Sequence, residues 1–316
     1  MNEKLALAVF ASETGTHLIR PPGTARWREH LRRFDAPAYE RRLAERGFRF
    51  VSGLPPLLRA IHDPPAGLFV RGAAPPALLE RPAVAIVGAR ACSGYGASVA
   101  RNLGRELAAA GLVVVSGLAR GVDGEAHRGA LDAAGTTVAV LGCGIDRDYP
   151  AAHADLARRI ADTGLIVSEY APGVEPAPWR FPARNRIVAG LASATVVVEA
   201  RERSGALITA DLALEEGREV FAVPGEITSA LSAGANALLK LGASPLTCAA
   251  DVLSSFGIDL DTHEAAADPL LDLLPATADE IVRSTGQAAA EVAAALVALE
   301  LDGRATVHDG VYRRTS

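Results

Sequence analysis

The feature that most constrains the fold is an alternation of short apolar runs and helix-like stretches between residues 82 and 223. The apolar runs lack polar alternation, which is typical of strands buried on both faces of a sheet. Helical stretches separate them, so successive strands are expected to run parallel with crossover helices between them. Strands are predicted at residues 84–87, 112–115, 137–141, 165–167, 195–198 and 219–223. The fold class is therefore α/β, with a doubly wound, mostly parallel sheet.

The flanking segments suggest a division into four parts. Residues 1–80 contain four Pro-Pro pairs and little periodicity, so they are interpreted as a short N-terminal accessory region. Residues 81–256 are assigned to a Rossmann-like domain. Residues 257–268 are acidic and Ala-rich, as expected of a linker, and residues 269–316 form a separate C-terminal domain.

The C-terminal domain is predicted to be a winged helix. Thr277 and Glu280 have the spacing of a capping box at the start of a helix, and a second helix is expected over residues 288–301. Two short strands around Asp309-Gly310 would form the wing. The second helix has no Lys or Arg, and residues 268–316 carry four arginines against eight carboxylates. This acidity argues against recognition of duplex DNA by the winged helix, and it favours a role in protein contacts or autoregulation.

Composition narrows the functional classes. The net charge of −5 gives no sign of a nucleic-acid binder, although a global charge can hide a local basic patch. Three dispersed cysteines, Cys92, Cys143 and Cys248, indicate reduced thiols rather than disulfides or a zinc site, and neither a metal nor a cofactor is expected. The apolar start is too short for a secretory signal, and no 18-residue apolar run exists. We therefore expect a cytoplasmic protein without a membrane partner.

Two glycine-rich loops follow the first two predicted strands, where ligands bind in doubly wound sheets. Glycines allow backbone amides to approach an anion at a helix N-terminus. The expected phosphate-binding positions in these loops are Gly88, Gly94, Gly96, Ser116, Gly117 and Gly121. Arg90, Ser93 and Arg120 would add side-chain donors. Neither loop is a P-loop or a GxGxxG fingerprint, so a tight turn without a ligand remains the alternative.

Asp123 and His127 raise a separate question. Asp123 is placed to cap the helix that it begins, and His127 lies one turn later. An acid–base dyad of these two residues is the less favoured interpretation.

The segment from Trp179 to Ile187 is the richest in candidate contacts. It contains three arginines together with Trp179 and Phe181. Guanidinium groups match phosphate oxygens and aromatic rings stack on bases, so Phe181, Arg184 and Arg186 are candidates for binding a single strand. Residues 179–203 hold five arginines against two glutamates, a local basic patch, although a solvated charged face is the alternative.

Several motifs in order along the chain resemble the DprA/Smf family of DNA-processing proteins. The resemblance covers about residues 55–254. The segments that carry it are Gly88-Ala89-Arg90, residues 116–123, residues 126–131, Val140-Leu141-Gly142, Tyr149-Pro150, Ser168-Glu169-Tyr170, residues 181–187, residues 204–210 and residues 217–225.

This resemblance implies a non-catalytic protein that binds and protects single-stranded DNA, acts as a homodimer and helps load RecA during natural transformation. A single-strand-binding protein is a further candidate partner. Carried over by motif, the expected DNA contacts are Arg90, Phe181, Arg184 and Arg186, and Ser93, Arg120 and Asn185 complete the set. The rival class is a nucleotide-binding enzyme similar to phosphoribohydrolases, but their Pro-Gly-Gly-x-Gly-Thr-x-x-Glu signature is missing here.

Overall fold

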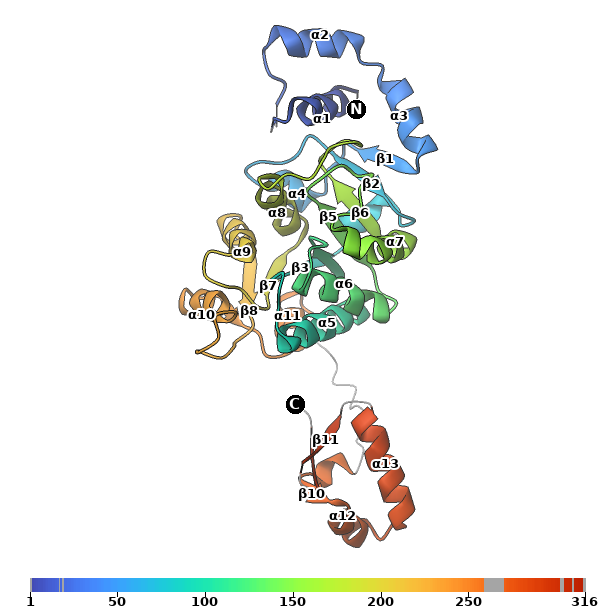
Figure 1. Ribbon diagram of the computed structural model, residues 1–316, viewed down its shortest axis with the longest axis vertical. Coiled ribbons are helices and arrows are strands. Elements are labelled where there is room, and N and C mark those ends of the chain that lie inside the picture. The colour runs from blue at the N-terminus through green and yellow to red at the C-terminus, as the bar shows by residue number, and fades with distance from the viewer. Residues whose placement is uncertain are drawn as a thin grey trace. The chain divides into compact units, whose positions relative to one another are not determined.

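The computed structural model describes residues 2–16, 18, 20–258, 270–301, 304–308 and 310–314. The chain divides into two compact units, Met1–Asp259 and Leu260–Ser316, and each is described by itself (Figure 1). Most of the expected linker, residues 259–268, lies outside the described residues.

The first unit contains a nine-stranded sheet in the order β1-β2-β6-β5-β4-β3-β7-β8-β9. Its strands are β1 Phe48–Val51, β2 Leu68–Arg71, β3 Ala83–Val87, β4 Val113–Ser116, β5 Thr137–Leu141, β6 Leu165–Ser168, β7 Ala194–Val197, β8 Glu219–Ala222 and β9 Ser244–Pro245. The six predicted strands correspond to β3 through β8. All pairings among these six are parallel, which confirms the doubly wound fold class.

The sheet extends beyond the expected range of 81–256. β2 pairs with β6 and β1 pairs with β2, both antiparallel, so residues 48–71 belong to the same sheet as the parallel strands. The boundary at residue 80 therefore does not coincide with the edge of the sheet. Phe69 and Val70 of β2 are fully buried in the core, and Phe48 of β1 is 9% exposed, so apolar burial holds both strands to the domain.

Helices cover both faces of the sheet. They are α1 Asn2–Thr14, α2 Ala25–Arg33, α3 Ala36–Glu45, α4 Pro56–Ala60, α5 Gly94–Ala109, α6 Val122–Asp132, α7 Ala154–Thr163, α8 Arg180–Leu191, α9 Gly205–Glu215, α10 Ala233–Lys240 and α11 Ala249–Ser255. Alternate residues of β3 show the two faces. Ala85 belongs to a core cluster that includes residues of α4, α8, α9 and α10, and Ile86 belongs to a second cluster that includes residues of α5, α6 and α11.

The strand order reverses at β3, because β4 lies on one side of it and β7 on the other. Loops that leave β3 and its neighbours at their carboxyl ends therefore separate to opposite faces and leave room between them. The two glycine-rich loops predicted to bind phosphate are at this position.

The first part of the expected accessory region, residues 1–47, contains α1, α2 and α3 (Figure 1). The apolar start of the sequence is the buried part of α1, where every side chain from Leu5 to Phe10 is buried. Ser12, on the same helix, accepts a hydrogen bond from the Ala171 amide at 2.9 Å and so joins α1 to the segment after β6.

The second unit has the two helices and the two wing strands predicted for a winged helix, and it adds one short strand, β10 Ala276–Thr277, that was not predicted. The predicted elements are α12 Ala278–Thr285, α13 Ala289–Leu301, β11 Ala305–His308 and β12 Val311–Arg314. Thr277 and Glu280 form the predicted capping box, and β11 pairs with β12 as the predicted wing. Ile281, Val292 and Leu296 form the centre of a small core.

The crossing of α5 and α6 depends on two helical glycines. A Cβ atom at Gly104 would collide with the carbonyl oxygen of Ala126, and one at Gly129 would collide with that of Arg101. We predict that Gly104→Ala or Gly129→Ala lowers the free energy of unfolding by about 1–3 kcal/mol, although alanine favours helices elsewhere. Urea unfolding measures the change. Gly94→Ala, with nothing within 4 Å of the added methyl, is the control, and equal effects would contradict the prediction.

Candidate nucleic-acid interface

A cavity of about 230 Å³ lies at the carboxyl ends of β3 and β4, between the two glycine-rich loops that follow these strands and the starts of α8 and α9. We call it the strand-end cavity. It is lined by Val87, Gly88, Ala89, Arg90, Gly117, Ala119, Asp123, Phe181, Pro182, Arg184, Asn185, Val188, Ser204, Gly205, Ala206 and Thr209. Six predicted site residues from three separate segments are therefore brought together here, namely Gly88, Arg90, Gly117, Phe181, Arg184 and Asn185.

A stack of three side chains forms one wall. The Arg90 guanidinium carbon lies 5.4 Å from the centre of the Phe181 ring, and the Tyr149 ring stacks on Phe181 at 5.3 Å. Arg90 is exposed and Tyr149 is 43% exposed, so both of these side chains can be reached from solvent. Tyr149 is absent from the predicted site. It could have been found from its position in the loop after β5, because the carboxyl ends of all parallel strands lie at the same edge of the sheet.

Arg184 forms the floor. Its Nη1 donates to the carbonyl oxygens of Gly117, at 2.7 Å, and of Val140, while Asp123 accepts from the amides of Gly117 and Ala119 at 3.1 and 3.3 Å. Burial raises the pKa of Asp123, and the Arg184 charge and the two amides oppose that rise. Burial lowers the pKa of Arg184, and Asp123 opposes it. Asp123 thus orders the second glycine loop and does not cap its own helix, where Gly121 is the N-cap.

The start of α9 forms the opposite wall. Asn185 donates from Nδ2 to the Gly205 carbonyl at 3.0 Å, and its Oδ1 accepts from Arg184 Nε at 3.2 Å. Ser204 is the N-cap of α9, but its side chain makes no capping hydrogen bond, and its buried hydroxyl has no partner among the described residues. The N-terminal end of a helix attracts anions, so this wall adds to the attraction of Arg90.

At the start of α5, where phosphate binding was predicted, the backbone and side chain of Ser93 are bound by Glu199. Glu199 is 4% exposed, and its carboxylate accepts from Ser93 N at 2.9 Å and from Ser93 Oγ at 2.5 Å. A Cβ at Gly96 would collide with the same carboxylate. A protein carboxylate thus takes the position expected for phosphate. Ser93, Gly94 and Gly96 lie outside the strand-end cavity.

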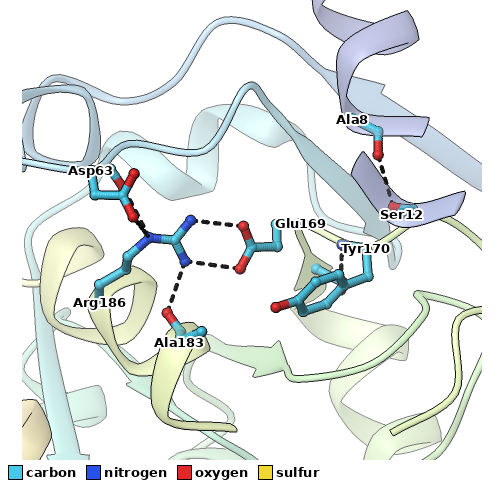
Figure 2. Close-up of polar contacts among 8 residues, drawn as sticks. Ala8, Ser12, Asp63, Glu169, Tyr170, Ala183 and Arg186 are labelled. Atoms are coloured by element: carbon cyan, nitrogen blue, oxygen red, sulfur yellow. Dashed lines mark hydrogen bonds and ion pairs between the residues drawn. The ribbon is translucent and has the colours of Figure 1, made fainter. Parts of the chain in front are cut away.

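Arg186, predicted as a DNA contact, is held by carboxylates in this structure (Figure 2). Its guanidinium faces the Glu169 carboxylate with two hydrogen bonds, from Nη1 at 2.8 Å and from Nη2 at 2.7 Å, and its Nε lies 3.3 Å from Asp63 Oδ2. Only 8% of Arg186 is exposed, and it does not line the strand-end cavity. This arginine ties α8 to the end of β6 and to the segment before β2. The predicted basic patch is therefore smaller at the surface than its sequence suggests.

The remaining predicted positions have mixed outcomes. Arg120 is exposed but does not line the strand-end cavity. Gly121 has φ +74°, and a Cβ there would collide with the Ala89 carbonyl, so it holds the two glycine loops against each other. Ser116 is buried and donates to the Ile86 carbonyl at 2.6 Å, which is a contact within the sheet.

The Asp123–His127 dyad is not formed. His127 Nδ1 lies 2.7 Å from Thr137 Oγ1, and that hydroxyl lies 2.6 Å from the Val114 carbonyl, to which it donates. Thr137 therefore accepts from a protonated Nδ1. Nε2 has no partner among the described residues, and burial lowers the pKa of His127 to about 3.

Two further features bear on the site. In the part of the chain that the structure describes, no cluster of three His, Cys, Asp or Glu side chains is arranged to hold a metal ion. Within the same residues, every helix is too short or too polar to span a lipid bilayer.

Comparison with known proteins places the chain in a family. The profile described as DNA recombination-mediator protein A matches residues 42–257, more than half of the chain. The chain belongs to this family. A DprA winged helix domain profile matches residues 259–311, which agrees with the second unit.

Individual DprA proteins are also similar. A Mycobacterium tuberculosis protein that carries the DprA name is 46% identical over 248 residues, which cover 73% of this chain and 64% of that protein. The X-ray structure of DprA from Streptococcus pneumoniae matches with a TM-score of 0.68 and 38% identity, over 80% of this chain and 93% of that one. A DprA structure from Helicobacter pylori, whose description concerns its single-stranded DNA binding mode, matches with a TM-score of 0.61 and 32% identity. The match covers 66% of this chain and 95% of that one.

The unusual ionisation of His127 predicts acid sensitivity. The unfolded chain binds this proton near pH 6.5 and the folded chain only near 3, so the stability is complete above pH 6.5 and is lost as the pH falls towards 3. By pH 5 the loss is about 2 kcal/mol. His127→Asn, which keeps a donor near Nδ1, should lose that much less between pH 7.5 and 5 in urea unfolding. Parallel pH profiles would contradict the assignment.

The pairing of Arg186 predicts a structural phenotype. Arg186→Ala should lower the free energy of unfolding by about 3–5 kcal/mol, because it leaves the Glu169 carboxylate buried without this partner. Thermal or urea unfolding measures the loss. Arg158→Ala, which removes an exposed arginine paired with Asp155, is the matched control and should change stability by less than about 0.5 kcal/mol. A stable Arg186→Ala variant would argue against the structural role.

Proposed function

We propose that this member of the DprA family is a non-catalytic protein that binds single-stranded DNA in the strand-end cavity. The observation that carries the proposal is the stack of Arg90, Phe181 and Tyr149 at the rim of a cavity lined by loop backbone. A single strand needs cations for its phosphates and flat surfaces for its bases, and this wall supplies both. An unstacked strand is flexible enough to reach such a recessed site.

The charges around the cavity support an anionic ligand. Asp123 is the one carboxylate among the lining residues, and it lies against Arg184. Arg90 therefore remains as the exposed cation at the rim, and the start of α9 adds a positive helix end. The H. pylori relative, which is described by its single-stranded DNA binding, agrees with this chemistry.

The wider role is inferred from the family. As a DprA protein, this chain would act in the cytoplasm as a homodimer, protect incoming single strands and help load RecA in natural transformation. A single-strand-binding protein is a further partner that this role involves. The winged helix would contact protein or regulate binding, in line with the acidic composition of residues 268–316.

The rival proposal, a phosphoribohydrolase-like enzyme, has less support. Such an enzyme needs a carboxylate free to act in the cavity. Glu199 is not among the lining residues and is held by Ser93, and Asp123 is held by the amides of Gly117 and Ala119. Release of adenine from AMP by the purified protein, at a rate that Asp123→Asn abolishes, would favour the enzyme instead.

Binding of oligo-dT by the full chain tests the proposal. We predict that Phe181→Ala weakens binding by about 1–3 kcal/mol, the value of one base stack. Arg90→Ala should reduce the slope of log K against log salt by about 0.7, the value of one phosphate contact. Fluorescence anisotropy across a salt series measures both. Arg105→Ala, an exposed arginine on α5 away from the cavity lining, is the control for Arg90. Unchanged affinity in both cavity variants would refute the proposed site.

A further inference from the structure

The N-terminal helices carry a concentration of positive charge that the strand-end cavity does not use. Residues 20–49 hold nine arginines, no lysine and four carboxylates, a balance of +5. The other residues hold 23 basic and 33 acidic side chains, a balance of −10. A protein that is acidic elsewhere thus has one strongly cationic segment, and it coincides with α2, α3 and β1.

The arginines of α2 and α3 are available to a ligand. We call their exposed side chains, together with Arg46 directly after α3, the α2–α3 surface; its members are Arg26, Arg28, Arg32, Arg33, Arg41, Arg42 and Arg46. Arg33 pairs with Glu29 at 2.6 Å and Arg46 with Asp146 at 3.0 Å. Among the described residues, no carboxylate pairs with Arg28, Arg32 or Arg41. These three cations are therefore compensated mainly by solvent.

A rigid aromatic core holds this surface in place. The rings of Phe10, Trp27, His30, Phe34 and Tyr39 contact one another in sequence, with centroid separations of 5.3 to 5.8 Å. Both helices have side-chain N-caps, from Thr24 and from Asp35. Because the helices are fixed, binding a ligand would order only side chains and not the backbone.

The α2–α3 surface is linked to the strand-end cavity by one loop. Arg46, just after α3, pairs with Asp146 in the loop that follows β5. Three residues later in that loop, Tyr149 stacks on Phe181 at the cavity rim. Arg147 lies between them and is 37% exposed, although it pairs with Glu175. An extended strand leaving the Phe181 stack can pass along this loop and reach α3.

We propose that the α2–α3 surface binds the sugar–phosphate backbone of the same DNA strand beyond the strand-end cavity. The proposal rests on the proposed function, because it extends that site. Its chemistry favours phosphate: guanidinium groups bind phosphate oxygens in pairs, and here all the cations are arginines. The aromatic rings of this segment are engaged with one another, so no base reading is expected. The surface lengthens the site without adding sequence preference.

A length comparison tests this with the full chain. Arg28→Ala, Arg32→Ala and Arg41→Ala are combined, and helix content is checked because alanine should preserve α2 and α3. Binding of oligo-dT of about six nucleotides, enough for the strand-end cavity alone, should be unchanged. Binding of oligo-dT of about 30 nucleotides should weaken roughly tenfold, and its salt slope should fall by about 2, the value of three phosphate contacts.

A matched triple variant controls for overall charge. Arg105, Arg158 and Arg159 are exposed on α5 and α7 and do not line the strand-end cavity, and replacing all three by alanine removes the same charge. This control should bind both oligonucleotides like the wild type. If it weakens the longer one equally, the effect is general electrostatics and the proposal fails.

The remaining outcomes separate the two proposals. If Phe181→Ala weakens binding of both oligonucleotides and the α2–α3 variant weakens binding of only the longer one, both proposals are supported. Failure of the wild type to bind either would refute the proposed function. Normal binding of the longer oligonucleotide by the α2–α3 variant overturns this inference alone. If that variant also loses binding to phosphatidylglycerol vesicles, the surface belongs to a membrane contact instead.

Discussion

The Arg184 guanidinium holds the centre of this domain together where parallel strands end. It donates to the loop after β4 and to β5, and it lies against Asp123 at the start of α6. Strand ends and loop turns leave backbone groups without sheet partners, and a buried group without a partner costs about 1–3 kcal/mol. One arginine and one carboxylate satisfy several of them at once. The cavity floor is therefore rigid before any ligand arrives.

Charge in this domain is sorted by depth. Near the strand ends, two buried carboxylates bind loop amides: Asp123 accepts from the second glycine loop, and Glu199 accepts from Ser93 at the start of α5. Arginines that point inward, Arg184 and Arg186, face these or other carboxylates. Arginines that point outward, such as Arg90 at the rim and those of the α2–α3 surface, remain accessible. This sorting leaves exposed arginines on the surface of a chain whose net charge is −5.

The sequence predicted the parallel strands well because their signal is local. Each apolar run is long enough to cross the sheet, and burial on both faces leaves no polar residue to confuse the pattern. β1 and β2 were missed because they are four residues each and flank a Pro-rich segment, and their attachment depends on antiparallel pairing with β6 far along the chain. The close approach of Gly104 and Gly129 at the α5–α6 crossing also needed the structure, since helical glycines alone do not reveal a crossing.

The composition of the site was readable from residue types, but the role of each side chain was not. Glycine loops after strands, and an arginine beside an aromatic residue, indicate an anion site wherever strands end at one edge, so Arg90 and Phe181 could be found from the sequence. Arg186 looked equivalent to Arg184 in the sequence, yet in the folded chain it pairs with Glu169 and Asp63. The fold also brings Glu199 to the amide of Ser93. The sequence by itself determined the six parallel strands and the loops that meet at their carboxyl ends. Only the tertiary structure decided which charges remain free, because that depends on partners brought together from distant parts of the chain.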